Sequence, residues 1–418
     1  MDTHAETLAV SADDVRAAAD LIRGNVLRTP LIPAPKLSEL TGADVYVKYE
    51  NLQVTNSFKD RGALVKLLSL SQEQRRRGVI AMSAGNHAQS VAYHSARLGV
   101  PALIVMPETT PYVKIGNTEA FGAEVVLSGA TLAESKGRME EIAKARQLTP
   151  IHPYDDARII AGQGTVALEV LDEQPQLDVL VIPIGGGGLI AGNAIAAKDV
   201  RPEIEVVGVE AALFPSMYHA VRGETGVCGG QTLAEGIAVK AAGELTVPIV
   251  KALVSEIILV DEDLIERAIC AFASLQKTMA EGAGAAGLAA MLDQPETFEG
   301  KKVGLYLSGG NIDPRVLASV IVRGLGREGK IVSLRITISD QPGMLGRIAS
   351  LLGEERANIL EVSHRRMFLD VPAKGATLDL LMESKDRAHA RQVMERLEHE
   401  GFQVRVLESL GGREITAE

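Results

Sequence analysis

Short apolar runs alternate with helical patterns from about residue 45 to residue 330, and this alternation restricts the possible fold more than any other feature of the sequence. The runs are almost entirely apolar, as expected for strands that helices cover on both faces. The predicted strands are Val79–Met82, Ala102–Met106, Glu124–Leu127, Val179–Ile184, Val206–Glu210 and Val303–Leu307. A helix is predicted over residues 131–147, with Thr131 as its N-cap and Glu134 as the reciprocal partner in a capping box. The alternation predicts an α/β fold with parallel strands.

A second pattern begins after residues 324–330, GLGREGK, whose glycine spacing predicts a linker. The 418 residues also exceed the roughly 250 to 300 residues at which a single core stops growing. Beyond the linker, the predicted strands and helices are, in chain order, Val332–Ile338, Met344–Leu352, Ile359–Arg366, Ala376–Met382, Arg387–Glu400 and Gln403–Leu407. The order βαββαβ predicts a separate ferredoxin-like domain over residues 331–418.

The formal net charge of −11 excludes several classes of partner. No basic stripe is present to contact nucleic acid, and an anionic membrane would repel the chain. The first ten residues lack the positive region of a secretory signal, and no apolar run approaches the roughly 18 residues of a membrane span. Cys228 and Cys270 have no metal-ligand spacing and form no disulfide framework. We expect a cytoplasmic protein with a small-molecule partner.

Four polar or glycine-rich segments follow or lie near the predicted strands, where ligands of α/β sheets bind. The first, Ser57–Gly62, contains Lys59, which taken alone is interpreted as a solvated charge at a helix start. The second, Ser83–His87, offers backbone N–H groups to a carboxylate or phosphate. Its simpler interpretation is a loop in which Ser83 or Asn86 caps the following helix.

The third segment, Gly185–Gly188, lets the backbone approach an anion at the start of a helix, and a phosphate is the expected ligand. It also supports a rival hypothesis. Gly186, Gly188 and Ala191 fit a G-x-G-x-x-A dinucleotide pattern, with Glu210 at a strand end about 20 residues later. A nicotinamide-dependent oxidoreductase is therefore an alternative, although it leaves the other segments unexplained.

The fourth segment is Ser308–Asn311, directly after a predicted strand. On its own it is interpreted as a glycine turn in which Ser308 bonds locally. Together, the four segments supply a lysine, an anion-binding loop and two polar strand ends. This combination suits a phosphorylated aldehyde.

The motifs SFKDRGA, SAGNHAQ, GGGGL and SGGN occur in this order, with IAGQGT at residues 160–165. From about Arg28 to Arg323 the chain closely resembles the fold-type II pyridoxal-phosphate enzymes, in particular the threonine dehydratase (threonine ammonia-lyase) and serine racemase group. The resemblance implies a tryptophan synthase β-like catalytic domain over residues 1–323, with two lobes. The small lobe, about residues 50–155, would be inserted in the large lobe.

The resemblance also implies roles for individual residues. Lys59 would carry pyridoxal 5′-phosphate as a Schiff base, with Phe58 packed on the pyridine ring. Asn86 would bond to the 3′-oxygen of the cofactor, and Ser308 would face the ring nitrogen. The phosphate would be held by Gly185, Gly186, Gly187, Gly188 and Leu189, and the substrate carboxylate by Ser83, Ala84, Gly85, Asn86 and His87.

The implied reaction is the removal of water and then ammonia from L-threonine, and also from L-serine, with Lys59 as the base at Cα. One methyl group changes binding by only ~1 to 3 kcal/mol, so serine is not expected to be excluded. Hydroxyaspartate ammonia-lyase and serine racemase are related alternatives, and a cofactor-free amino-acid sensor is one from a different class. The role is threonine catabolism or isoleucine biosynthesis.

Two residues differ from the serine racemases. Ala84 stands where those enzymes carry the serine that acts as the second base, so racemisation is disfavoured. Their divalent-metal site uses residues that match Glu210 and a position near Ser216, where this chain lacks the second carboxylate. We expect no essential divalent metal.

The C-terminal block resembles an ACT domain, the amino-acid-sensing module of many biosynthetic enzymes, through Ser339–Leu345 and Ala357–Ile359. The predicted effector residues are Pro342, Gly343, Leu345, Asn358 and Ile359. The turn at Pro342 and Gly343 exposes backbone donors that suit the carboxylate of an amino-acid effector. The alternative is an oligomerisation module without a ligand. We expect a homo-oligomer, either a dimer or a tetramer.

Overall fold

The computed structural model describes residues 8–365 and 375–407, which divide into two units, Met1–Ile312 and Asp313–Glu418. Arg366, predicted as the end of a strand, lies outside the described residues, as do residues 1–7 and 408–418 of the predicted domains. In the described part of the chain, no helix is both long enough and apolar enough to cross a membrane.

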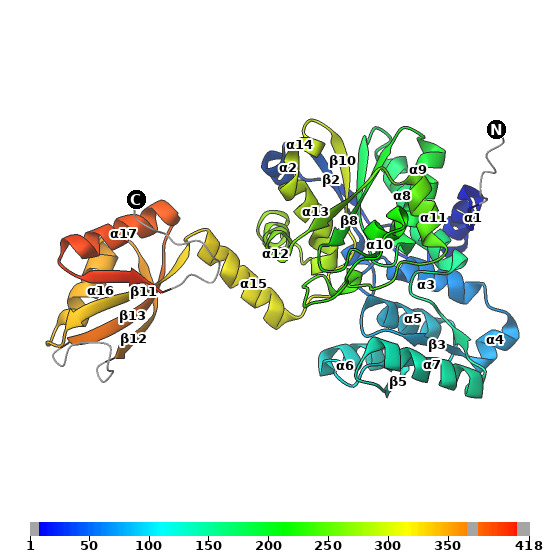
Figure 1. The fold of residues 1–418 in the computed structure, drawn as a ribbon, viewed down its shortest axis with the longest axis horizontal. Helices are drawn as coiled ribbons and strands as arrows, with labels where there is room; N and C mark the ends of the chain where they lie inside the picture. The colour runs from blue at the N-terminus through cyan, green and yellow to red at the C-terminus, as the bar shows by residue number, and fades with distance from the viewer. Residues whose placement is uncertain (1–7, 366–374, 408–418) are drawn as a thin grey trace. The chain divides into compact units, whose positions relative to one another are not determined.

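The larger sheet of the first unit has six strands in the order β1-β2-β10-β7-β8-β9, all parallel except β1 (Figure 1). Its strands are β1 (Leu31–Pro33), β2 (Asp44–Tyr49), β7 (Val179–Pro183), β8 (Glu205–Ala211), β9 (Glu256–Val260) and β10 (Lys302–Leu307). In β7 every residue is buried, because helices cover both faces of the sheet. The α/β prediction is confirmed.

Helices flank this sheet on both sides, as Figure 1 shows. On one side lie α1 (Ala12–Ile22), α8 (Ala157–Glu173), α9 (Gly188–Val200) and α11 (Thr246–Leu253). On the other lie α2 (Pro35–Thr41), α12 (Glu262–Ala271), α13 (Gly282–Asp293) and α14 (Pro295–Phe298). Shorter elements are η1 (Glu50–Leu52), α10 (Ser216–Arg222), η2 (Glu235–Ile237) and the π-helical η3 (Phe272–Gln276).

Glycines in two of the sequence motifs allow helices to cross closely. A Cβ on Gly162 would lie 2.6 Å from the Cα of Gly62 in α3 (Lys59–Leu68). A Cβ on Gly192 of α9 would lie 2.1 Å from the carbonyl oxygen of Ile160. The IAGQGT motif therefore packs α8 against α3 and α9, which fixes the helix that begins at Lys59.

The second sheet of the first unit is parallel, in the order β5-β4-β3-β6. Its strands are β3 (Val79–Met82), β4 (Ala102–Met106), β5 (Glu124–Leu127) and β6 (Thr149–Pro150), and its helices include α4 (Gln72–Arg77), α5 (Asn86–Arg97), α6 (Tyr112–Ala120) and α7 (Leu132–Arg146). The capping box predicted for α7 is half wrong. Thr131 accepts from the N–H of Glu134, as predicted, but the Glu134 carboxylate accepts from the N–H of Ala130 rather than from that of Thr131.

The second unit begins with α15 (Pro314–Arg327), capped by Asp313. Residues 324–327, predicted as linker, are the last residues of this helix, so that part of the prediction is wrong. A glycine inside a helix lowers helix stability by only ~1 kcal/mol, so Gly324 and Gly326 do not end α15. The predicted linker retains only residues 328–330 between α15 and the next strand.

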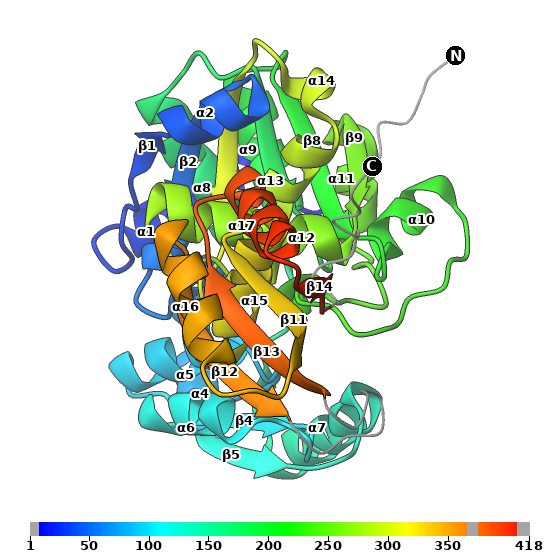
Figure 2. The same cartoon turned by 90° about the vertical axis from the view of Figure 1, so that its left-hand side faces the viewer.

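A four-stranded antiparallel sheet, in the order β12-β13-β11-β14, follows α15. Its elements are β11 (Ile331–Ser339), α16 (Met344–Glu354), β12 (Asn358–Arg365), β13 (Gly375–Glu383), α17 (Arg387–His399) and β14 (Gln403–Val406). Both helices lie on one face of the sheet (Figure 2), where alternate residues of β11 and β13 are buried. The predicted βαββαβ order is confirmed.

Candidate active site

Lys59 is the first residue of α3, and it is not the solvated charge that its sequence position alone suggests. Its Nζ donates a hydrogen bond to the carbonyl oxygen of Pro153 at 2.7 Å and lies 5.1 Å from the centroid of the Phe58 ring. Burial lowers the pKa of the Lys59 amine to about 8, although the nearby Glu281 carboxylate opposes the shift. A neutral, nucleophilic amine is therefore accessible close to physiological pH.

A buried ion network fixes the helix that carries Lys59. The Arg61 guanidinium bonds to Glu50 and Glu169, both at 2.7 Å, and the side chains of Arg61 and Glu50 are 0% exposed. Lys48 also reaches Glu169 at 2.7 Å. The network joins β2, η1 and α8 to the start of α3.

The Ser83–His87 segment connects the carboxyl end of β3 to α5. The capping interpretation of this loop is wrong, because no side chain caps α5 and Ser83 Oγ accepts from the N–H of Gly85 instead. His87 Nε2 lies 3.0 Å from the carbonyl oxygen of Ile151. Burial lowers the pKa of His87 to about 3, so its ring is neutral beside Lys59.

The glycine loop, Gly185–Gly188, joins β7 to α9. Its Gly186 carbonyl accepts from Thr246 Oγ1 at 2.7 Å and from the N–H of Gly243 at 3.2 Å. At the helix start, the N–H of Ala191 bonds to the carbonyl of Gly187, so the N–H groups before it have no acceptor within α9. These N–H groups form a suitable anion site.

Tyr154 packs directly against the glycine loop and was not identified from the sequence. A Cβ on Gly186 would lie 2.2 Å from Cδ2 of the Tyr154 ring, and one on Gly188 would lie 2.9 Å from the Tyr154 carbonyl. The Tyr154 hydroxyl donates to the carbonyl of Ala241 at 3.0 Å. The chain's own packing therefore requires glycine at both positions.

The Ser308–Asn311 segment follows β10 and meets two of the other segments. The Ser308 carbonyl accepts from the N–H of Phe58 at 3.0 Å. Asn311 Nδ2 donates to Asn86 Oδ1 at 2.7 Å. With the bond from Lys59 to Pro153, which adjoins Tyr154 and the glycine loop, these contacts connect all four segments.

Glu281 is a second residue that was not identified from the sequence. Its Oε1 accepts from Asn86 Nδ2 at 2.6 Å. Burial raises the pKa of the Glu281 carboxyl to about 7, an effect that the bond from Asn86 reduces. No motif marked Glu281, because it lies 195 residues from Asn86 in the chain and only the fold brings the two together.

The Glu210 carboxylate is 0% exposed and already has donors within the chain. Its oxygens accept from the N–H groups of Met217 and Tyr218, each at 2.8 Å. Burial raises the pKa of Glu210 to about 7, despite these bonds. Both carboxylate oxygens therefore already bond to N–H groups of the chain. The nicotinamide hypothesis requires this carboxylate to bond to a ribose hydroxyl instead, so the structure does not favour that hypothesis.

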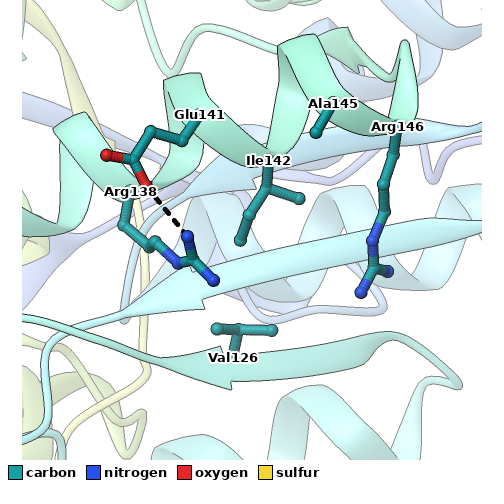
Figure 3. A pocket seen from close by; sticks show the side chains of 6 residues that line it. All are labelled: Val126, Arg138, Glu141, Ile142, Ala145 and Arg146. Carbon is teal, nitrogen blue, oxygen red and sulfur yellow. Dashed lines mark hydrogen bonds and ion pairs between the residues drawn. The ribbon is translucent and has the colours of Figure 1, made fainter.

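A hollow between α7 and β5 lies apart from the candidate site (Figure 3). Its lining residues are Val126, Arg138, Glu141, Ile142, Ala145 and Arg146. Both arginines have partners, since Arg138 pairs with Glu141 and Arg146 pairs with Glu124, each at 2.9 Å. None of the predicted site residues lines it.

The predicted effector residues lie at two places in the second unit, and all are exposed except Ile359, which is half-buried against the core. Pro342 precedes Gly343, which adopts a φ of 90° as the N-cap of α16, and Leu345 is 37% exposed. Asn358 and Ile359 begin β12, where Asn358 Nδ2 donates to Glu383 at 3.3 Å.

Comparison with known proteins places these sites in two families. The pyridoxal-phosphate dependent enzyme family matches residues 22–309, and the ACT domain family matches residues 332–399. The L-threonine ammonia-lyase of Thermotoga maritima is 41% identical over 400 residues, which cover 95% of this chain and 100% of that protein.

Two solved structures resemble the first unit at the same TM-score of 0.69. The serine racemase of Dictyostelium discoideum is 36% identical, with 73% of this chain and 99% of that chain covered. Threonine deaminase isoform 2 of Solanum lycopersicum is also 36% identical, with 74% of this chain and 86% of that chain covered. The fold alone therefore does not separate elimination from racemisation.

Proposed function

The chain belongs to the pyridoxal-phosphate dependent enzymes, among the threonine ammonia-lyases with a C-terminal ACT domain, and we propose that it deaminates L-threonine to 2-oxobutanoate and ammonia. L-Serine, lacking one methyl group, is proposed as a second substrate that yields pyruvate. The observation that carries the proposal is the buried Lys59 amine, with a pKa of about 8, in a site that also contains the glycine loop.

The residues present fit pyridoxal phosphate. The N–H groups at the start of α9 suit its phosphate, and Gly185–Gly188 with Leu189 are the residues proposed to hold it. Phe58 and Ser308, which meet through the bond from the Phe58 N–H to the Ser308 carbonyl, are proposed to lie against the ring and at its nitrogen. Asn86 is proposed to donate to the 3′-oxygen. When bound, the cofactor supplies the electron sink for carbanion chemistry at Cα.

Lys59 is proposed to move the proton in the first chemical step. The neutral form of its Nζ, accessible because the pKa is about 8, would take the Cα proton of the substrate. The β-hydroxyl would leave as water with a proton donated by the cofactor phosphate, and hydrolysis of the resulting enamine would release ammonia and the 2-oxo acid. The Ser83–His87 loop is proposed to bind the substrate carboxylate through the backbone N–H groups at the start of α5, because no side chain caps that helix; the N–H of Gly85 already bonds to Ser83 Oγ. Because the His87 ring is neutral, it adds no positive charge to the carboxylate site, and the backbone N–H groups bind the carboxylate.

Elimination is proposed in preference to racemisation because of Ala84. Racemisation needs a second base on the opposite face of the substrate, and a methyl side chain transfers no proton. The similarity to a serine racemase at TM-score 0.69 makes this the closest alternative. Hydroxyaspartate ammonia-lyase remains a second alternative, which differs only in the side chain accepted beside Ser83–His87.

The proposed function is tested by measuring 2-oxo acid release from L-threonine, L-serine and 3-hydroxyaspartate, with D-serine formation followed in parallel. We expect the fastest release with L-threonine, no D-serine, and no activity in Lys59→Ala. If the purified chain is colourless, or if Lys59→Ala still releases 2-oxobutanoate, the proposal is wrong. Faster turnover of hydroxyaspartate, or D-serine formation, favours the corresponding alternative.

We further propose that the second unit regulates the first by binding an amino acid at Pro342, Gly343, Leu345, Asn358 and Ile359. The ACT family match supports an effector, but its identity is not restricted to isoleucine. Residues 1–323 are proposed as the catalytic domain, with residues 50–155 as its small lobe. A homo-oligomer in the cytoplasm is proposed as the working form. Measuring L-threonine turnover with and without isoleucine or valine tests whether the second unit regulates the first.

A further inference from the structure

The side-chain amide of Asn86 is held from both ends. Its Nδ2 donates to Glu281 Oε1 at 2.6 Å, and its Oδ1 accepts from Asn311 Nδ2 at 2.7 Å. The three residues come from the start of α5, the N-cap of α13 and the segment that follows β10. An amide with one acceptor and one donor as neighbours has only one favourable orientation.

The orientation of Asn311 is itself set by the backbone. Asn311 Nδ2 also donates to the carbonyl oxygen of Thr55 at 2.8 Å. A backbone carbonyl cannot become a donor, so it requires the nitrogen of Asn311 on that side. The same nitrogen then requires the oxygen of Asn86. The chain of bonds from Thr55 through Asn311 and Asn86 to Glu281 has one direction.

Glu281 is built into the site with similar constraints. Its side chain makes no capping bond, although it is the N-cap residue of α13, and reaches Asn86 instead. Its N–H donates to the carbonyl of Gly309 at 3.1 Å. A Cβ on Gly309 would lie 2.2 Å from Glu281 Oε1, so glycine is needed there to make room for the carboxylate. The SGGN motif thus accommodates one partner of Asn86 and provides the other.

One proton of Asn86 is left over. Its Nδ2 has two protons and gives one to Glu281, and in the part of the chain that the structure describes no protein acceptor takes the second. We propose that Glu281 and Asn311 are positioning residues, which orient the Asn86 amide so that this second proton is available to the 3′-oxygen of the cofactor. The inference rests on the proposed function, because it needs the cofactor beside Asn86.

The experiment measures the dissociation constant of pyridoxal phosphate from the cofactor-free chain, which needs no turnover. Glu281→Leu removes the acceptor, and Asn311→Asp replaces the donor by an acceptor at nearly the same volume. Each variant is expected to weaken pyridoxal phosphate binding by about tenfold, because the proposed hydrogen bond from Asn86 to the 3′-oxygen of the cofactor would be lost. Glu281→Gln keeps an acceptor and is expected to stay within about threefold of the wild type.

A matched control is Glu235→Gln, which removes a nearby negative charge on a side chain that is 69% exposed and pairs with Lys114. Its dissociation constant is expected to stay within about twofold of the wild-type value. If Glu235→Gln weakens binding as much as Glu281→Leu, the effect is one of general charge and the inference is wrong. If Glu281→Leu does not fold, as judged by circular dichroism, Asn311→Asp carries the same test.

The Asn86→Ala background separates positioning from a structural role. Because Glu281 acts through Asn86, adding Glu281→Leu to Asn86→Ala is expected to weaken binding no further. Additive losses contradict the inference, as does unchanged binding in both Glu281→Leu and Asn311→Asp. If Asn86→Ala itself leaves binding unchanged, the proposed contact of Asn86 with the cofactor is also wrong, which distinguishes that failure from a failure of positioning alone.

Discussion

At the scale of the residue, Lys59 shows how burial changes the chemistry of a common side chain. Its amine lies 5.1 Å from the centroid of the Phe58 ring and donates a hydrogen bond to the carbonyl of Pro153. The charged form loses hydration, and the pKa falls from 10.5 to about 8. The carboxylate of Glu281 limits the fall, because an adjacent negative charge favours the ammonium.

This pKa predicts the pH dependence of cofactor uptake by the cofactor-free chain. Only the neutral amine attacks an aldehyde, and it predominates above its pKa, so the uptake rate should rise with pH with a midpoint near 8. Stopped-flow absorbance measures the rate, and Nα-acetyl-lysine in the same buffers supplies the midpoint for an ordinary ε-amine. A midpoint above 10 for the protein contradicts a buried Lys59.

Glu210 leads to a prediction about metal dependence. Its two oxygens each accept a backbone N–H, from Met217 and Tyr218, and Ser216 supplies no second carboxylate. A hard divalent cation prefers several oxygen ligands. We expect threonine turnover to be unchanged, within about 20%, after dialysis against a chelator. Loss of activity that magnesium restores overturns this prediction.

The sequence identified the residues that form patterns and missed those that act only across the fold. Lys59, Asn86 and Ser308 lie in motifs, so the sequence alone predicts that their segments lie near strand ends. Glu281 and Tyr154 lie in no such pattern, and their importance comes from contacts with Asn86 and the glycine loop. The donor to the Glu134 carboxylate was predicted one residue away from the true one. The carboxylate accepts from the N–H of Ala130 rather than from that of Thr131, which only the local backbone conformation decides.

At the scale of the element, the glycine loop and the segment before α8 are packed as one unit. A methyl group at Gly186 would overlap the Tyr154 ring. We expect Gly186→Ala to weaken pyridoxal phosphate binding by roughly tenfold to a hundredfold, since overpacking typically costs ~1 to 3 kcal/mol. Adding Tyr154→Ala makes room for the methyl group, so the double variant should bind more tightly than Gly186→Ala alone.

Gly116→Ala is the matched control, because a Cβ there meets nothing within 4 Å. It should bind pyridoxal phosphate like the wild type. Equal binding by Gly186→Ala and the wild type, or no gain from Tyr154→Ala, would show that the loop and Tyr154 do not pack as described.

The ion network behind α3 predicts a large loss of stability on truncation of Arg61. In Arg61→Ala the Glu50 carboxylate, which is 0% exposed, loses its bidentate partner, and such a loss costs ~3 to 5 kcal/mol. Arg138→Ala removes an arginine that is 50% exposed and pairs with Glu141, and should cost less than about 1 kcal/mol. Urea unfolding measures both, and similar losses in the two variants contradict the prediction.

The elements themselves were largely predictable where one pattern controls them. The strands β3, β4 and β5 have the predicted bounds, because nearly all of their residues are apolar and Ser83, Pro107 and Ser128 follow them directly. Residues 324–327 were not predicted as helix, because glycine spacing argues for a linker while the helix that begins after Asp313 continues through them. Tertiary and helical context outweighed a local preference of ~1 kcal/mol per glycine.

At the scale of the whole molecule, the two units have separate cores. One hydrophobic cluster includes residues from Val10 to Tyr306, and another extends from Val332 to Phe402. The similar serine racemase structure is covered over 99% of its length by 73% of this chain, so a chain of about the first unit's size forms this fold. The activity and its regulation are therefore expected to be separable.

A chain that ends at Glu328 is predicted to keep the site and lose regulation. It retains the elements that contain Lys59, Asn86, the glycine loop and Ser308. We expect it to bind pyridoxal phosphate and deaminate threonine within about fivefold of the full chain, with no response to amino-acid effectors. If the truncated chain folds but binds no cofactor, the first unit alone does not form the site, which contradicts this prediction.

Whether Lys59 holds pyridoxal phosphate can be measured by borohydride reduction of the purified chain followed by peptide mass mapping. Reduction fixes the cofactor to the amine that carries it. We expect a phosphopyridoxyl group on the peptide that contains Lys59 and on no other lysine. A modified lysine elsewhere, with Lys59 unmodified, would show that Lys59 does not hold the cofactor.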